Sequence, residues 1–382
     1  MSTSILFPKE FGLAWNSEGY EAEQYIRARP IYPPILVDLI LSYHRHFSTS
    51  PHFTGVADIG CGPGQLAINF SHHFHHTYGV DPSPRSLVLA ESLQKFTKDQ
   101  GAVYGLPTPS PKPIEYKQGT ASGTSLPDQC VDLIVAGSCA HWWGLDDLET
   151  RNKTWLEFAR ILRPGGTVAI IGHRAVIGPA RGASEADERI KNAFGVERIL
   201  KDPEVIAQLE KAGVDPLAFI SQGEESSDPL SAKKAIVLNR IGGSRRYGLI
   251  TLPSDDTVWE TSSSSHAFLG IDLPDDHFIE RKPDPMPGWA PPVIHEYLAS
   301  SASERRSLVP GTTTPKARAE LARSASWYIR YLEQNPEEKA LVASDGDWIG
   351  RKLKNICEEE GIAYEQEIEQ RVGFLVVFFR RK

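Results

Sequence analysis

A glycine-rich turn carries the strongest chemical signal in the chain. It reads Asp58-Ile59-Gly60-Cys61-Gly62-Pro63-Gly64 and stands between a β-type run at 55–57 and a helical pattern at 65–74. Glycines at alternate positions allow a tight turn and let the backbone approach a ligand closely. A turn of this kind between a strand and a helix is typical of nucleotide and nucleoside sites in α/β proteins.

A second acidic residue supports a nucleoside site. Asp81 ends the next expected strand, and 81 − 58 = 23 residues separate it from Asp58. An acid at the tip of the second strand of a βαβ unit can accept hydrogen bonds from ribose hydroxyls. A nicotinamide-type fingerprint would place its third glycine at position 65, which is Gln65, so an NAD dehydrogenase is disfavoured.

Alternating strands and helices must position these residues. We expect strands at 55–60, 76–81, 114–119, 131–137 and 166–172, and helices at 34–47, 65–74, 84–96 and 148–162. The alternation predicts an α/β fold with a parallel sheet and helices on both faces. Further helices are expected at 183–198, 203–212 and 316–334, and a helix that Asp345 or Asp347 caps through Glu360, before β-type runs at 364–372 and 373–380.

Composition narrows the function classes. The chain has 382 residues, enough for a core with an additional domain, and its net charge of −8 argues against nonspecific nucleic-acid binding. Its longest apolar run, 374–379, is too short to span a bilayer, and we expect no secretory signal. Four cysteines without paired spacing fit a reducing, cytoplasmic location, and we expect no metal site.

Four motifs together indicate a family. They are Trp15 to Tyr20 with Arg29-Pro30-Ile31-Tyr32-Pro33, the turn at 58–64, Cys139-Ala140-His141-Trp142-Trp143, and Leu162-Arg163-Pro164-Gly165-Gly166-Thr167. With these motifs the chain resembles class I S-adenosylmethionine-dependent methyltransferases, and more narrowly the trans-aconitate methyltransferase group and its fungal small-molecule relatives. Tyr328-Ile329-Arg330 is similar to a Y-x-R motif of that group.

The resemblance implies a Rossmann-like class I methyltransferase fold, with a mostly parallel seven-stranded sheet whose last strand is antiparallel, plus an inserted cap. We divide the chain into four segments accordingly. They are an N-terminal helical lid (1–50), a cofactor-binding core (51–174), a substrate cap (175–344), and a C-terminal helix with a β-hairpin that completes the sheet (345–382).

The expected cofactor is S-adenosyl-L-methionine, with S-adenosyl-L-homocysteine as product. Asp58 would meet its ammonium group, the glycines would admit its methionine part, and Asp81 would bind its ribose. The full set of expected cofactor contacts is Asp58, Gly60, Cys61, Gly62, Gly64, Asp81, Pro82, Thr120, Ala121, Ser138, Tyr20 and Trp15. Many relatives hold the adenine amine with an acid after the third strand; this chain has none there, so Thr120, Ser122 or backbone carbonyls are left for that task.

The expected acceptor is a small-molecule carboxylate, giving a methyl ester. His141 and Trp142 are the candidate catalytic residues, and Arg29, Tyr32, His141, Tyr328 and Arg330 the candidate substrate contacts. A carboxylate is already ionised near neutral pH and needs no general base. Two alternatives stay open: a hydroxyl O- or N-methyltransferase of secondary metabolism with His141 as base, and a non-catalytic cofactor-binding regulator. We expect no nucleic-acid or membrane partner, and the sequence leaves the oligomeric state open.

Overall fold

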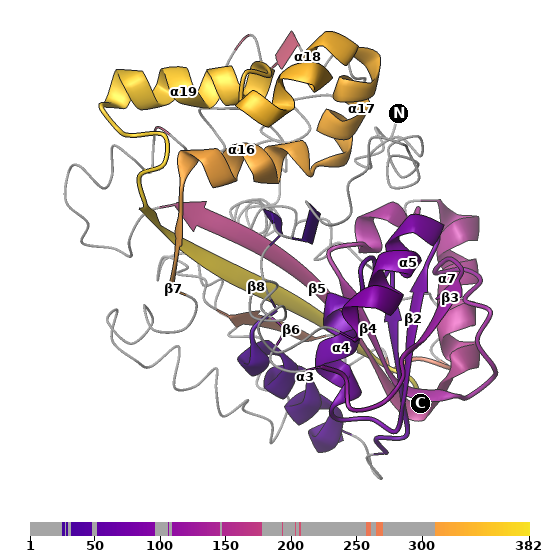
Figure 1. Cartoon of the computed structure of the whole chain (residues 1–382). Coiled ribbons are helices and arrows are strands. Elements are labelled where there is room, and N and C mark those ends of the chain that lie inside the picture. Colours follow the sequence, from indigo (N-terminus) through magenta and orange to yellow (C-terminus); the bar gives the residue numbers. More distant parts are fainter. Residues whose placement is uncertain are drawn as a thin grey trace, which may run out of the picture.

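The structure is a computed structural model of the whole chain, shown in Figure 1. It describes residues 25–26, 28–29, 32–47, 52–95, 106, 109–145, 147–177, 193, 203, 206–207, 257–260, 265–269 and 310–382. Of the expected helices at 183–198 and 203–212, the structure describes only residues 193, 203 and 206–207, which are helical; the rest of both segments and most of the irregular run at 251–315 lie outside the described residues.

An eight-stranded sheet organises the described residues. The strands are β1 (Gly55–Ile59), β2 (His76–Asp81), β3 (Glu115–Gln118), β4 (Val131–Gly137), β5 (Leu162–Ile177), β6 (Ser265–Leu269), β7 (Pro310–Thr313) and β8 (Ile368–Arg380). Their order is β3-β2-β1-β4-β5-β8-β6, with β7 also paired to β8. β1 to β5 pair in parallel and β8 runs antiparallel to β5, so the expected Rossmann-like α/β fold is confirmed, with eight described strands where seven were expected.

Helices cover both faces of the parallel strands. On one face, α3 (Pro34–Phe47) and α4 (Gln65–Ser71) pack on alternate strand residues such as Val56 and Leu133. α5 (Pro84–Leu93) joins α4 beside β2 and β3. On the other face, α7 (Leu148–Ile161) buries Trp155 and Phe158 against the sheet. Burial of both faces explains the nearly continuous apolar composition of β1 and β4.

A second helical layer lies beyond the carboxyl end of β5 (Figure 1). It comprises α16 (Pro315–Arg323), α17 (Ser326–Gln334), α18 (Pro336–Leu341), the short η4 (Val342–Ser344) and α19 (Trp348–Glu360). We call it the α16–α19 layer. β7 leads into the layer and β8 leads out of it, and these two strands pair with each other. The layer has its own core, in which α19 packs mainly on α16 and which also includes Ile368 of β8.

Local sequence explains where several helices begin and end. The side chain of Ser83 accepts a hydrogen bond from Ser86 N at the start of α5, and Thr314 caps α16 in the same way through Ala317 N. Gly361 ends α19 in the left-handed conformation. In the described residues, no helix combines the length and apolar character that a bilayer crossing requires.

Two predicted elements are wrong, and one predicted helix cap is confirmed in position only. The hairpin expected within 364–380 is one continuous strand, β8, because both of its halves pair with the long strand β5, from Thr167↔Arg380 to Ile177↔Gln370. The helix expected at 316–334 is two helices, because Ala325 adopts an extended conformation. Asp347 occupies the cap position of α19, but its side chain makes no cap hydrogen bond and bonds to Arg323 and Tyr328 instead.

Candidate active site

The glycine turn follows β1 at the carboxyl edge of the parallel strands. Gly60, Gly62 and Gly64 have φ values of 76°, 51° and 84°, in the left-handed region that favours glycine. A Cβ at Gly60 would lie 2.7 Å from Cys139 Sγ, whereas a Cβ at Gly62 would meet nothing within 4 Å. Gly60 is therefore needed for packing of the turn, while the position of Gly62 leaves space for a ligand.

Hydrogen bonds from the next strand hold this turn. The backbone N–H groups of Gly60 and Cys61 donate to Val80 O at 2.7 and 3.0 Å. Asp81 accepts from Gly62 N at 2.8 Å through Oδ2 and from Ser83 N at 2.8 Å through Oδ1. Burial raises the pKa of Asp81 and the two backbone hydrogen bonds oppose that rise. Asp81 thus fixes the turn, and each of its oxygens keeps a second lone pair that could accept from a ribose hydroxyl.

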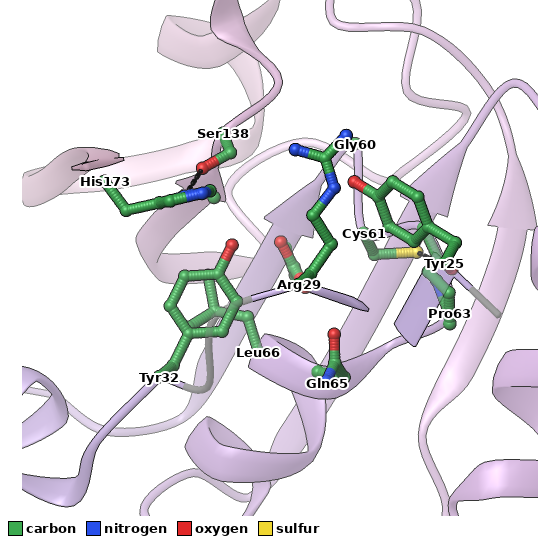
Figure 2. A pocket seen from close by; sticks show the side chains of 13 residues that line it. Tyr25, Arg29, Tyr32, Gly60, Cys61, Pro63, Gln65, Leu66, Ser138 and His173 are labelled. Carbon is green, nitrogen blue, oxygen red and sulfur yellow. Dashed lines mark hydrogen bonds between the residues drawn. The ribbon is translucent and has the colours of Figure 1, made fainter. Parts of the chain in front are cut away.

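A pocket opens beside the turn (Figure 2). It is lined by residues from the N-terminal segment, the turn, the first turn of α4, and the ends of β4 and β5. The lining residues are Tyr25, Arg29, Tyr32, Asp58, Gly60, Cys61, Gly62, Pro63, Gln65, Leu66, Gly137, Ser138 and His173. The pocket therefore lies at the carboxyl edge of the sheet, where ligands bind in open α/β folds.

Asp58 is the acidic side chain of this lining. It is 1% exposed, and its Oδ2 accepts from Ala67 N at 3.0 Å. Its buried Oδ1 has no hydrogen-bond partner within the described residues. Burial raises the pKa of Asp58 to about 8, against the lowering effect of the Ala67 hydrogen bond. A buried carboxylate oxygen without a partner fits a cationic ligand group, because such a group would restore the lost solvation.

Arg29 is the basic side chain of the same lining. Its guanidinium carbon lies 4.6 Å from the Tyr25 ring centroid, and its Nη2 donates to Ser324 O at 3.1 Å. Its buried Nε has no hydrogen-bond partner in the part of the chain that the structure describes. The pocket thus presents a carboxyl group, Asp58, and a guanidinium group, Arg29. Each has one buried polar atom without a hydrogen-bond partner among the described residues.

A hydrogen-bonded pair of side chains, Ser138 and His173, lies at the other end of the pocket in Figure 2. Ser138 Oγ and His173 Nδ1 are 2.6 Å apart, and Tyr32 lines the pocket beside them. Burial, with a smaller effect of Arg29, lowers the pKa of His173 to about 3. Ser138 adopts a left-handed φ of 55°, which is uncommon for serine. His173 is consequently neutral at physiological pH and is a weak base.

The pocket brings together some of the expected site residues. Those that line it are Asp58, Gly60, Cys61, Gly62, Ser138, Arg29 and Tyr32. Gly64 is at the start of α4, where an added Cβ would collide with the Tyr116 hydroxyl. Burial raises the pKa values of the Cys61 and Cys139 thiols well above their usual range, so both are poor nucleophiles.

Other expected residues lie elsewhere. His141 and Trp142 form the short helix η2 (Ala140–Trp142) after β4, and Trp142 packs against the α16–α19 layer. Ala121 is buried in the sheet core, and Thr120 forms a tight turn with Gly123 beside exposed Pro82. Tyr328 is fully buried within the layer, where its hydroxyl donates to Asp347, and it does not line the pocket; its substrate contact stays a prediction. Trp15, Tyr20 and the side chain of Arg330 lie outside the described residues.

Sequence reasoning missed several lining residues, of which His173 is the most important. The strand containing it was expected to end at residue 172, although β5 continues to Ile177. The sequence feature that could have identified His173 is its position one residue beyond the expected end of that strand, at the edge where Asp81 and Ser138 also lie. Gln65, whose identity disfavours an NAD site, also lines the pocket, and Tyr25 stands outside any expected motif.

Sequence comparison agrees with this geometry. Residues 57–170 match the methyltransferase domain family. The probable S-adenosylmethionine-dependent methyltransferase CRG1 of Saccharomyces cerevisiae is 27% identical over 157 residues, 41% of this chain and 46% of the relative. Methyltransferase tpcM of Aspergillus fumigatus is 31% identical over 159 residues, 42% of each chain. The chain thus spans less than half the length of each of these relatives.

A solved S-adenosylmethionine-dependent methyltransferase from Clostridium acetobutylicum is similar over 40% of this chain and 50% of its own, with 18% identity and a TM-score of 0.27. Residues 57–170 are thus similar to the methyltransferase domain of S-adenosylmethionine-dependent enzymes, and the sheet order and the glycine turn agree with that similarity. The residues present fit the cofactor of these enzymes: Asp58 Oδ1 offers a buried acceptor for the ammonium group, and Gly62 leaves the approach open.

Cofactor affinity is expected to rise with pH between about pH 6 and pH 8 and then to level off. In the free protein the raised pKa of about 8 keeps Asp58 largely protonated at neutral pH, whereas an ammonium partner favours the carboxylate. Binding therefore releases a proton, and affinity gains up to about tenfold per pH unit below the free-state pKa. Calorimetry in buffers of different ionisation enthalpy measures that proton. Affinity that stays constant or falls over this range would contradict the assignment.

Proposed function

We propose that the protein is an S-adenosylmethionine-dependent O-methyltransferase that converts a small-molecule carboxylate into its methyl ester. The bound cofactor supplies a methyl group made electrophilic by its positive sulfur. The chain's own residues then have to bind and orient the reactants and to exclude water. The partner we propose is accordingly a small organic acid, and the net charge of −8 gives no support to a nucleic-acid substrate.

The observation that carries this proposal is the low basicity of the histidine in the pocket. His173 is the histidine among the described residues that line the pocket, and burial lowers its pKa to about 3. A group of that basicity is poorly matched to deprotonating a hydroxyl at neutral pH. A carboxylate is already ionised and requires no such base. The pocket chemistry thus favours an acceptor that arrives as an anion.

Product identification tests the proposal. The protein is incubated with methyl-labelled cofactor and matched pairs of small acids and their corresponding alcohols or phenols. We expect label in a product that mild alkali hydrolyses to methanol, as an ester does, and none in the alcohols or phenols. Alkali-stable label in a phenol or amine would refute carboxyl methylation while leaving the methyltransferase activity standing.

The alternative with His141 as base is tested by His141→Asn. A carboxylate methyltransferase is expected to keep kcat within about threefold, since no proton is removed from the acceptor. A hydroxyl or amine methyltransferase that relies on this histidine would lose about 100-fold in kcat. Steady-state kinetics against the preferred acceptor measure the difference. His72→Asn, at an exposed histidine at the end of α4, is the matched control.

A further inference from the structure

The Arg29 guanidinium joins two parts of the protein that are 295 residues apart in sequence. One edge donates from Nη2 to Ser324 O, which lies at the junction between α16 and α17. Another edge carries Nε, which is buried and has no hydrogen-bond partner among the described residues, at the wall of the cofactor pocket (Figure 2). The Tyr25 ring covers one face of the guanidinium. One side chain therefore contacts both the pocket and the α16–α19 layer.

The charges of the pocket match those of an amino acid. Asp58 and Arg29 are the acidic and basic residues of the described lining, and each has one buried polar atom without a partner. The methionine part of the cofactor carries an ammonium group and a carboxylate. A guanidinium binds a carboxylate through two parallel hydrogen bonds when its fork is available. We propose that Arg29 binds the cofactor carboxylate and, through Ser324, fastens the α16–α19 layer over the pocket.

This assignment replaces the acceptor contact expected for Arg29 from the sequence. Arg29 contributes to the lowered pKa of His173, and the neutral His173 therefore neither competes for the carboxylate nor repels Arg29. An isolated buried guanidinium edge is costly, and a carboxylate partner would remove that cost. The inference rests on the cofactor of the methyltransferase domain and not on the acceptor. Failure of the esterification test would therefore leave it standing.

Attachment of the layer follows from the same contact. Ser324 O is a backbone acceptor in the segment where Ala325 separates α16 from α17. Trp142, directly after β4, packs against the core of the same layer. A carboxylate that fixes one edge of Arg29 reduces the entropy cost of fixing the other edge at Ser324. Cofactor binding should therefore reduce opening of the α16–α19 layer.

Ligands that lack one group at a time test the first half of the proposal. Calorimetry compares S-adenosylmethionine with its decarboxylated form, which keeps the ammonium group, and with 5′-methylthioadenosine, which lacks both groups. We expect Arg29→Met to weaken S-adenosylmethionine binding by about 10- to 100-fold and to leave the other two ligands unchanged. Equal weakening of all three ligands, or no weakening of any, would overturn the assignment. Unchanged binding of 5′-methylthioadenosine also reports that the variant is folded.

Hydrogen exchange tests the second half. In the wild-type protein, S-adenosylhomocysteine is expected to slow amide exchange in residues 315–334, and in Arg29→Met this protection should be lost at ligand saturation. Arg29→Lys should keep part of the carboxylate affinity but not the added protection, because one ammonium lacks the fork that reaches both partners. Ligand-induced protection of 315–334 that persists in both saturated variants, or that is absent from the wild type, would refute the attachment.

Discussion

Asp58→Asn is expected to weaken S-adenosylmethionine binding by about 100-fold or more. The carboxylate is 1% exposed, and its free Oδ1 is the acceptor that an ammonium group would use. Asparagine can still accept from Ala67 N through its amide oxygen, but its NH₂ group would then face the ligand cation. Removing one partner of a buried charge pair costs about 3–5 kcal/mol, which corresponds to at least two orders of magnitude in affinity. Calorimetric titration measures the change.

Two controls separate ligand recognition from damage to the fold. 5′-Methylthioadenosine has no ammonium group and should bind Asp58→Asn as it binds the wild type. Asp132→Asn changes another buried aspartate, 3% exposed, at the opposite edge of the sheet, where it accepts from Thr54 and Gly55 and pairs with Arg163. That variant should lower stability and leave cofactor affinity of the folded protein unchanged. An Asp58→Asn protein with wild-type affinity would rule out the ammonium contact.

The core could be predicted because its signals are local. Alternation of strand and helix fixes a parallel sheet, and the spacing from Asp58 to Asp81 places both acids at its carboxyl edge. The short-range chemistry of the glycine turn also follows from sequence, since its φ values need glycine wherever the turn occurs. These features depend on neighbours a few residues away, so a single sequence contains them.

The features that could not be predicted depend on contacts with residues far away in the sequence. A glycine at position 373 favours a turn, yet β8 continues through it because the 16-residue β5 pairs with residues 370–380. The same extension of β5 moves His173 from a loop to the wall of the pocket. Arg29 is defined by a contact 295 residues away. Residue type identified Arg29 as a binding candidate, but only the fold shows that it lines the same pocket as Asp58 and donates to Ser324 O.

A buried ion pair holds the α16–α19 layer together. Arg323 is 6% exposed and Asp347 is fully buried. Arg323 Nε donates to Asp347 Oδ2 at 3.0 Å, Nη2 bonds to Asp347 Oδ1, and Nη1 pairs with Asp345 at 2.7 Å. Burial alone would lower the pKa of Arg323, but the hydrogen bonds to the two carboxylates outweigh it and raise that pKa. The Tyr328 hydroxyl adds a further donor to Asp347 at 2.5 Å.

Arg323→Met is expected to destabilise this layer by about 3–5 kcal/mol, because it leaves Asp347 buried without its cationic partner. The double variant Arg323→Met/Asp347→Leu should recover most of that loss, since it removes both charges. Lys153→Met, which deletes the exposed pair with Glu149, should have no measurable effect. Chemical denaturation, with hydrogen exchange of α16 to α19, measures the three variants. A single variant as stable as the wild type would show that the layer does not depend on the pair, and the layer would then be held by its apolar core around Trp348 and Leu353.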